Sequence, residues 1–364
     1  MICLPIIRTN WNSFQKEIDV NGPSKPRQLS IWDDMQPDEV RQVPVPSEGI
    51  GGELLNIMSK GLYTNPLDAI REYVQNSIDA GSDNVEIQIT GNSVWILDDG
   101  DGMNGDRLIQ ARDFGVSSKS IMENVGFRGI GIYSGFDLCE RLVIRTKPKF
   151  DNKEYILTFN FGDMRRKLEA ARQSPARPVI PLSLLLEEHT RVTYKNSTRE
   201  NQSFTLVQLE ELSNNHIHRL SNILEMKGYI LRTLPLRFSE EFKHADDIEK
   251  ALRKNVDGYK SARVILKIEN SPQIIVEKPN IPDLGAPTTG FIKDSTGKKM
   301  AFYWACLTSI SEAISARGFV DFAGLVYKIK GFTIGNTDNL RNHFTRKQMY
   351  LWWTGEIYVI DPEI

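Results

Sequence analysis

The chain has 364 residues, 40% hydrophobic and 25% charged, a composition typical of globular proteins that excludes general disorder. Its 45 Lys and Arg nearly balance 47 Asp and Glu, so overall charge gives no argument for nucleic-acid binding, although a local basic patch remains open. The most apolar stretch, residues 300–310, is shorter than the roughly 20 residues that span a bilayer. The N-terminus lacks a basic start, so we expect no secretory signal and no membrane partner. The scattered Cys3, Cys139 and Cys306 fit a reducing cytoplasm, where we expect the protein to reside.

Residues 1–48 are expected to form an N-terminal arm. Six prolines in this stretch disfavour long helices and central strands, and it holds two isolated tryptophans, Trp11 and Trp32. Either the arm packs on its own domain, or it crosses to a second subunit and buries these aromatic side chains there.

The pattern of residues 49–204 is mixed α/β. Asn65 and Pro66 are typical of a helix start, and Gly81 is typical of the residue that follows a helix. Residues 85–90 and 93–97, joined by a Gly-Asn turn, predict a hairpin. Further strands are expected at 141–147, 154–161 and 190–194, and a basic helix begins near residue 163.

Residues 205–364 are expected to form a second α/β domain. Apolar spacing predicts a helix over 206–224 and a second helical segment ending at Leu234. Strands are expected at 262–268, 272–277, 323–329 and 356–360.

The segment REYVQNSIDA, residues 71–80, places a polar stripe on an otherwise apolar helix. Glu72, Asn76 and Asp79 stand at i, i+4 and i+7 and therefore share one face. This stripe is either a plain solvent-facing surface or part of a site.

The segment Asp98-Asp-Gly-Asp-Gly-Met103 follows a strand. A calcium loop is excluded, because the twelfth position counted from Asp99 is Gln110 and not a carboxylate. It is either a bare turn or a loop whose glycines let the backbone approach a flat ligand, with Asp98 accepting an amine proton.

The segment from Gly126 to Ser134 has the spacing G-x-x-G-x-G, which differs from the dinucleotide pattern G-x-G-x-x-G. It offers free backbone N–H groups ahead of a helix, which suits phosphates. By itself this signal is weak.

In their order and spacing, the three segments resemble the GHKL (Bergerat-fold) ATPase superfamily, which includes gyrase B, heat-shock chaperones, histidine kinases and MutL. Residues 189–194 are similar to its late G-T-x-V strand, with His189 in place of Gly, and residues 114–119 to the lid of the gyrase and MORC branches. The resemblance covers about residues 49–196 and is closest to the heat-shock-chaperone-like and MORC/MutL-like branches. It implies an α+β sandwich that binds ATP and Mg²⁺.

The resemblance implies a role for each matching residue. Glu72 would be the general base for the attacking water, and Asn76 would ligate Mg²⁺. Asp98 would accept the adenine amino proton, with Thr190 sharing a water beside it. Lys119 is either a phosphate contact or a plain exposed lid lysine. The remaining nucleotide-binding positions would be Asp79, Gly102, Met103, Gly126, Gly129 and Gly131.

Residues 217–238 and 322–331 resemble the second domain of heat-shock-type chaperones, a transducer that delivers a cation to the γ-phosphate. The candidate cations are Lys328, Lys330, Arg341 and Arg346. Alternatively this residue lies beyond Ile364, and the chain is then the N-terminal piece of a longer protein.

The resemblance therefore implies a Mg²⁺-dependent ATPase. ATP would close the lid and drive homodimerisation of a chaperone-like or regulatory protein that acts on a macromolecular client. One alternative is a MORC- or MutL-like DNA clamp, which the basic run Arg165-Arg166-Lys167 keeps open. Another is a nucleotide-binding switch with little hydrolysis. No segment resembles a dimerising histidine-box helix, which disfavours a sensor kinase.

Overall fold

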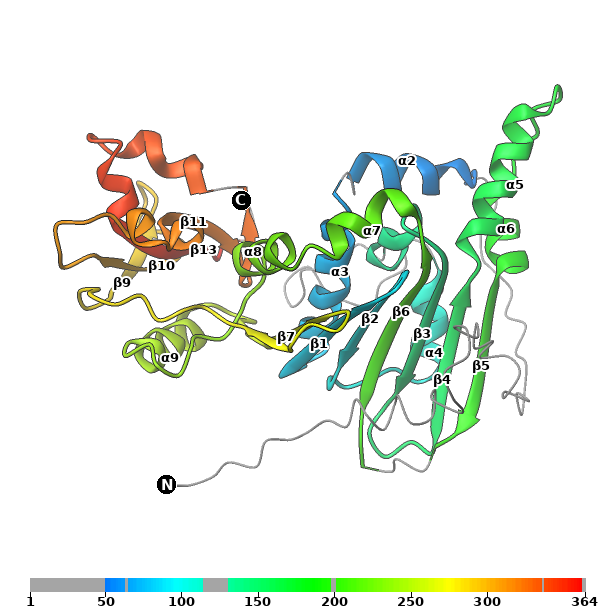
Figure 1. Cartoon of the computed structure of the whole chain (residues 1–364), viewed down its shortest axis with the longest axis horizontal. Coiled ribbons are helices and arrows are strands. Elements are labelled where there is room, and N and C mark those ends of the chain that lie inside the picture. Colours follow the sequence, from blue (N-terminus) through cyan, green and yellow to red (C-terminus); the bar gives the residue numbers. More distant parts are fainter. Residues whose placement is uncertain (1–49, 63–64, 114–129, 198–200, 336, 362–364) are drawn as a thin grey trace.

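A computed structural model describes residues 50–62, 65–113, 130–197, 201–335 and 337–361. The arm, the lid segment 114–119 and the predicted site residues Lys119, Gly126 and Gly129 lie outside these residues. Two sheets dominate the described chain and lie side by side, with helix α8 (Ile223–Thr233) between them (Figure 1). Within the described ranges, no helix is both long and apolar enough to cross a membrane.

The larger sheet has eight strands in the order β5-β4-β3-β6-β2-β1-β7-β8. Neighbouring strands are antiparallel except β1 and β7, which run parallel. The strands are β1 (Asn84–Thr90), β2 (Ser93–Asp98), β3 (Cys139–Lys147), β4 (Lys153–Phe159), β5 (Thr190–Asn196), β6 (Phe204–Leu212), β7 (Arg263–Ile268) and β8 (Ile274–Val276).

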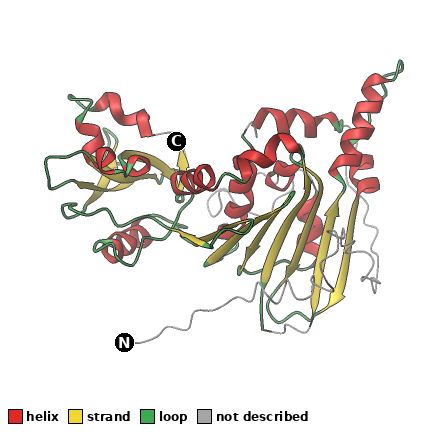
Figure 2. Cartoon of the chain, in the orientation of Figure 1, coloured by secondary structure: helices red, strands yellow, loops and turns green. Residues whose placement is uncertain are grey.

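Helices cover one face of this sheet (Figure 2). Alternate residues of the strands, such as Val94, Ile96 and Leu142, form the main core with the apolar side of α3. The helices of this part are α2 (Glu53–Leu62), α3 (Pro66–Asp79), α4 (Gly105–Arg112), the 3-10 turn η1 (Gly131–Gly135), α5 (Phe161–Gln173), α6 (Leu182–His189) and α7 (Asn214–Leu220).

The smaller sheet has five strands in the order β12-β11-β13-β10-β9. A separate core packs on it, built around Phe302, Trp304 and Tyr358. Its strands are β9 (Thr288–Lys293), β10 (Lys299–Leu307), β11 (Gly324–Ile329), β12 (Phe332–Ile334) and β13 (Trp353–Val359). Its helices are α9 (Ala245–Asn255) and the 3-10 turns η2 (Ile314–Arg317), η3 (Val320–Phe322), η4 (Thr337–His343) and η5 (Met349–Trp352).

The mixed α/β architecture with two sheets confirms the expected fold class. The helix after Asn65 and the hairpin at 84–98 are also confirmed. The helix predicted over 206–224 is wrong in its first part, because residues 204–212 form strand β6 in the middle of the larger sheet. The first six residues of β6 are all buried, so its two faces do not alternate in polarity and its apolar spacing imitates a helix.

The larger sheet also continues past the boundary expected after residue 204. Strand β6 lies between β3 and β2, and β7 and β8 extend the sheet beside β1. Residues 204–212 and 263–276 therefore belong to the sheet that carries the predicted site. Between them, residues of α9 such as Ile248 and Leu252 already pack in the core of the smaller sheet.

Candidate functional site

Helix α3 is fixed at its N-terminus by the side chain of Asn65. Asn65 Oδ1 accepts a hydrogen bond from the Leu67 N–H at 3.1 Å, and Pro66 occupies the first helical position. The apolar side of the helix, including Val74 and Ile78, is buried against the sheet. The polar stripe of Glu72, Asn76 and Asp79 is only partly buried, so its groups remain accessible.

The loop after β2 is bound to the end of α3. Asp98 is buried, and its Oδ2 accepts a hydrogen bond from Ser77 Oγ at 2.7 Å. Its Oδ1 accepts the Gly100 N–H at 3.0 Å, and the Asp101 N–H donates to the Ala80 carbonyl, also at 3.0 Å. These contacts hold Asp98 within one turn of Asn76 on the helix.

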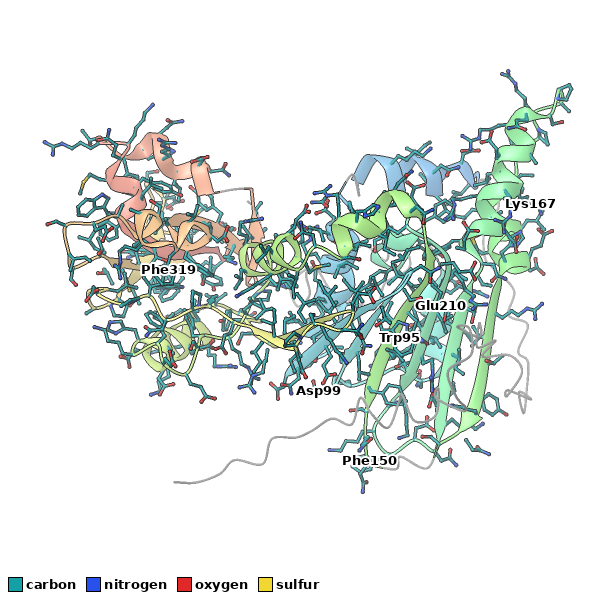
Figure 3. All side chains as sticks on the ribbon, in the orientation of Figure 1. Trp95, Asp99, Phe150, Lys167, Glu210 and Phe319 are labelled. Atoms are coloured by element: carbon teal, nitrogen blue, oxygen red, sulfur yellow. The ribbon has the colours of Figure 1, made fainter. Side chains whose placement is uncertain are left out.

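The neighbouring Asp99 binds the turn between α3 and β1 instead of the helix. Its carboxylate accepts hydrogen bonds from the Ser82 hydroxyl at 2.7 Å and from the N–H groups of Asp83 and Asn84 at 2.8 and 2.9 Å. Figure 3 shows Asp99 at the end of the β1–β2 hairpin. Asp99 therefore fastens the turn after α3, while Asp98 points to the helix.

Burial raises the pKa of the Asp98 carboxyl to about 6, while the hydrogen bonds from Ser77 and Gly100 favour its charged form. Near neutral pH the group is therefore mostly ionised, but it titrates within a pH range that an assay can reach.

Gly102 needs to be glycine. Its φ is +69°, and a Cβ at this position would lie 2.2 Å from the Lys147 carbonyl oxygen. The next residue, Met103, donates its N–H to Thr146 Oγ1 at 2.8 Å and packs against the main core. The loop is thereby held at the ends of β2 and β3.

The described end of the glycine-rich segment lies against α3. A Cβ on Gly131 would be 3.1 Å from Glu72 Oε2 and 3.6 Å from Asn76 Nδ2. Tyr73 reinforces this approach, because its hydroxyl donates to the Ile132 carbonyl and accepts the Gly135 N–H, both at 3.0 Å. The structure thus brings Glu72, Asn76, Asp98 and Gly131 together around one helix, and we call this group the α3 site.

Thr190 does not lie in the α3 site. It begins β5, an edge strand that β4, β3 and β6 separate from β2, which is roughly 19 Å at about 4.8 Å per strand. Its hydroxyl donates to the Leu186 carbonyl at 2.7 Å and so closes helix α6. The expectation that Thr190 adjoins Asp98 is therefore wrong.

The threonine beside Asp98 is Thr205, a residue outside the motifs that predicted the site. Thr205 pairs directly with Asp98 across β6 and β2, and its hydroxyl lies 3.1 Å from Thr146 Oγ1. Residues 205–207 read Thr-Leu-Val, the same Thr-x-Val spacing as residues 190–192. The repeated Thr-x-Val spacing is the sequence signal that could have identified Thr205. Only the strand register distinguishes Thr205 from Thr190.

The start of α3 also contacts the chain beyond residue 212. The Tyr229 hydroxyl on α8 donates to Asp68 in the first turn of α3, while Glu72 Oε1 accepts from its neighbour Arg71 Nη2 at 3.0 Å. At the other end of the helix, Lys260 Nζ donates to the Asp79 carbonyl at 2.6 Å. Both ends of α3 are thus tied to the segment that leads to the smaller sheet.

The basic run on α5 is neutralised by neighbours. Arg165 and Arg166 pair with Glu140 at 2.6 and 2.7 Å, and Lys167 pairs with Glu188. Figure 3 shows Lys167 on α5, on the side of the larger sheet away from the smaller one. This run is therefore not an unpaired basic patch.

The candidate γ-phosphate contacts differ in exposure. Lys328 is buried and pairs with Glu356, whereas Arg341 and Arg346 are exposed. Arg341 lies 3.8 Å from Asp338. Lys330 is partly buried and has a positive φ of 48° at the turn after β11.

The arrangement of a polar helix, an Asp-led loop and a glycine segment on an antiparallel sheet is that of a GHKL-type nucleotide-binding domain. The family model described as "Histidine kinase-, DNA gyrase B-, and HSP90-like ATPase" matches residues 63–193. Residues 63–193 are accordingly similar to a GHKL-type ATPase domain, and part of the chain is also similar to MutL proteins.

Two curated relatives share part of the chain. One is the DNA mismatch repair protein MutL of Bradyrhizobium sp. (strain ORS 278), 29% identical over 148 residues, which are 38% of this chain and 23% of the relative. The other is MutL of Azorhizobium caulinodans, 34% identical over 93 residues, or 23% of this chain and 15% of the relative. The similarity therefore spans less than a quarter of either relative.

Proposed function

We propose that the chain binds ATP with Mg²⁺ at the α3 site and hydrolyses it. The observation that carries this proposal is the convergence on α3 of three groups with different tasks. Asp98 is fixed through Ser77, and Gly131 approaches both Glu72 and Asn76. A base-recognising carboxylate, a side-chain amide and a glycine backbone thus adjoin one another, as a purine, a metal ion and phosphates require.

Asp98 would recognise the adenine ring. Its buried carboxylate can accept the exocyclic amino proton as a charge-assisted hydrogen bond. Gly102 and Met103 would line the ring, since the loop is fixed at Thr146. Thr205 takes over the part expected of Thr190, because its strand adjoins Asp98.

The donor set around α3 fits Mg²⁺ better than a metal with an all-protein cage. The described residues contain no group of three or more His, Cys, Asp or Glu side chains that could hold a metal ion. Mg²⁺ commonly takes one or two protein ligands and completes its octahedron with phosphates and waters. Asn76 would hold the ion through its side-chain oxygen, and Asp79 lies one turn further along the same face.

Glu72 would act on water. Its Oε1 is held by Arg71 at 3.0 Å, and its Oε2 faces the glycine segment. A carboxylate oriented in this way can accept a proton from the attacking water, a contribution of roughly 10²–10⁴ in rate. Lys119, Gly126 and Gly129, together with Gly131, would complete the phosphate contacts.

ATP would close the lid and promote dimerisation through the arm, so that the protein works on a macromolecular client. A DNA clamp is the second candidate, favoured by the two MutL relatives. The ion pairs along α5 weaken the argument that this helix forms a basic patch for DNA. Arg341 and Arg346 are exposed and could contact DNA in a clamp, or the γ-phosphate of ATP.

Calorimetric titration of the chain with ATP tests the proposal. We expect one ATP per chain, with tighter binding when Mg²⁺ is present. Asn76→Ala should remove most of this Mg²⁺ effect, whereas Asn215→Ala, an exposed amide on α7, should retain it. Absence of saturable binding, or an unchanged Mg²⁺ effect in Asn76→Ala, would contradict the assignment.

A further inference from the structure

A cavity of about 220 Å³ lies between the end of α8 and the smaller sheet, away from the α3 site. We call it the Lys328 cavity. Much of its wall is aromatic, and its rim carries Arg232 and Asp321, which pair with each other at 2.5 Å. The aromatic residues of the wall are Tyr229, Phe238, Phe242, Trp304 and Phe322.

Three buried charged side chains also line the cavity. Lys278 follows β8, Lys328 lies on β11 and Glu356 lies on β13, and their side chains are only 6%, 2% and 8% exposed. Lys328 is paired in register with Tyr358, two residues beyond Glu356, which places the Lys328 and Glu356 side chains on the same face of the sheet.

The carboxylate of Glu356 is already well supplied with donors. Its Oε2 accepts hydrogen bonds from Lys278 Nζ at 2.8 Å, Trp304 Nε1 at 2.9 Å and the Tyr358 hydroxyl at 2.7 Å. Only Oε1 remains for Lys328 Nζ, at 3.4 Å. Among the described residues Glu356 is the single acceptor of Lys328, whose ammonium carries three N–H donors.

The cluster therefore contains two ammonium groups and one carboxylate. The Arg232–Asp321 pair at the rim adds no net charge, so one positive charge stays uncompensated inside an aromatic wall. Burial lowers the pKa of Lys328 to about 8, while Glu356 favours its charged form. Such a charge is costly unless an anion joins it.

We propose that the Lys328 cavity binds a small organic monoanion, a carboxylate with an aromatic or branched apolar body. The carboxylate would lie against Lys328 and Lys278, and the body would pack on Phe238 and Trp304. The cavity volume of about 220 Å³ and its partly aromatic wall suit a compact ligand. This proposal does not rest on the assignment of ATP to the α3 site.

Calorimetry of the whole chain with benzoate, and with benzamide as its neutral isostere, tests whether the cavity binds an aromatic ligand and whether it recognises the carboxylate charge. We expect one benzoate per chain and at least tenfold weaker binding of benzamide. Equal binding of the two ligands would show an apolar cavity without charge recognition. Tighter binding of inorganic phosphate than of benzoate, or no saturable binding of benzoate, would also overturn the proposal.

Variants locate the site. Lys328→Met leaves a balanced Lys278–Glu356 pair and should weaken benzoate binding at least tenfold, whereas Lys328→Arg should retain most of it. Lys293→Met, at an exposed lysine of the same sheet, is the matched control and should bind as the wild type does. Circular dichroism verifies that each variant is folded. Undiminished binding in folded Lys328→Met would contradict the assignment.

Discussion

In the α3 site the ionisable groups are arranged around the accessible side of a helix, whereas in the Lys328 cavity they are enclosed between strands. Glu72 and Asn76 are partly exposed, and only Asp98 is buried. Lys278, Lys328 and Glu356 are all buried and rely on one another. Substitutions in the first region should therefore change ATP binding and turnover, whereas loss of the shared carboxylate in the second region should change the free energy of unfolding.

The sharpest contrast in stability is expected from Glu356. Glu356→Gln leaves two buried ammonium groups without their shared carboxylate and should lower the free energy of unfolding by about 3–5 kcal/mol. Lys328→Met removes the surplus charge and should cause no loss. Urea unfolding of both variants measures the difference. Equal destabilisation by both would mean that the two lysines are compensated equally and that the cluster holds no surplus charge.

The pH dependence of ATP binding should report on Asp98. Since burial raises its pKa to about 6, the charge that accepts the adenine proton is lost below that pH, and affinity should fall by up to about tenfold per pH unit. Calorimetry from pH 7.5 to 5 measures this fall. Asp98→Asn should bind ATP about tenfold or more weakly at neutral pH, and its affinity should not show the fall that titration of Asp98 causes. Any fall that remains in this variant measures protonation of the nucleotide itself.

The same shift has a consequence for folding. The folded-state pKa of Asp98 lies above its ordinary value of 3.8, so the group contributes stability at low pH that is lost as pH rises through about 6. The ionised form of Asp98 therefore lowers the free energy of unfolding, as is common for groups that serve binding. If Asp98→Asn binds ATP as the wild type does, Asp98 does not contact the base.

A smaller effect should separate the two threonines. Thr205→Val should weaken ATP binding about two- to tenfold, since one hydroxyl hydrogen bond contributes about 0.5–1.5 kcal/mol. Thr190→Val should leave affinity unchanged and lower only stability, because its hydroxyl closes α6. Calorimetric titration with ATP compares the two variants. A larger loss of ATP affinity in Thr190→Val than in Thr205→Val would show that Thr190 contacts the nucleotide.

The α3 site could largely be predicted from sequence because its signals are local. Asn65, Pro66 and the i, i+4, i+7 spacing of the polar stripe define one helix and one face. Thr205 could not be chosen over Thr190, because both precede a Val by two residues and only the order of the strands decides. Strand β6 was missed for a related reason, since burial on both faces removes the alternation that identifies a strand.

The Lys328 cavity gave no signal in the sequence. Its three charged residues stand at positions 278, 328 and 356 on separate elements of the chain, and each alone resembles an ordinary surface charge. Only the parallel pairing of β11 with β13 places Lys328 beside Glu356. Local periodicity cannot predict such a tertiary cluster.

The most direct test of the central claim, that the α3 site hydrolyses ATP, is the turnover and ATP affinity of Glu72→Ala. Turnover should fall by roughly 10²–10⁴, the usual contribution of a general base, while ATP affinity stays within about threefold of wild type. Glu187→Ala, which removes an exposed carboxylate on α6, should change neither. Unchanged turnover in Glu72→Ala, or an equal loss of binding and turnover, would contradict the role assigned to this helix face.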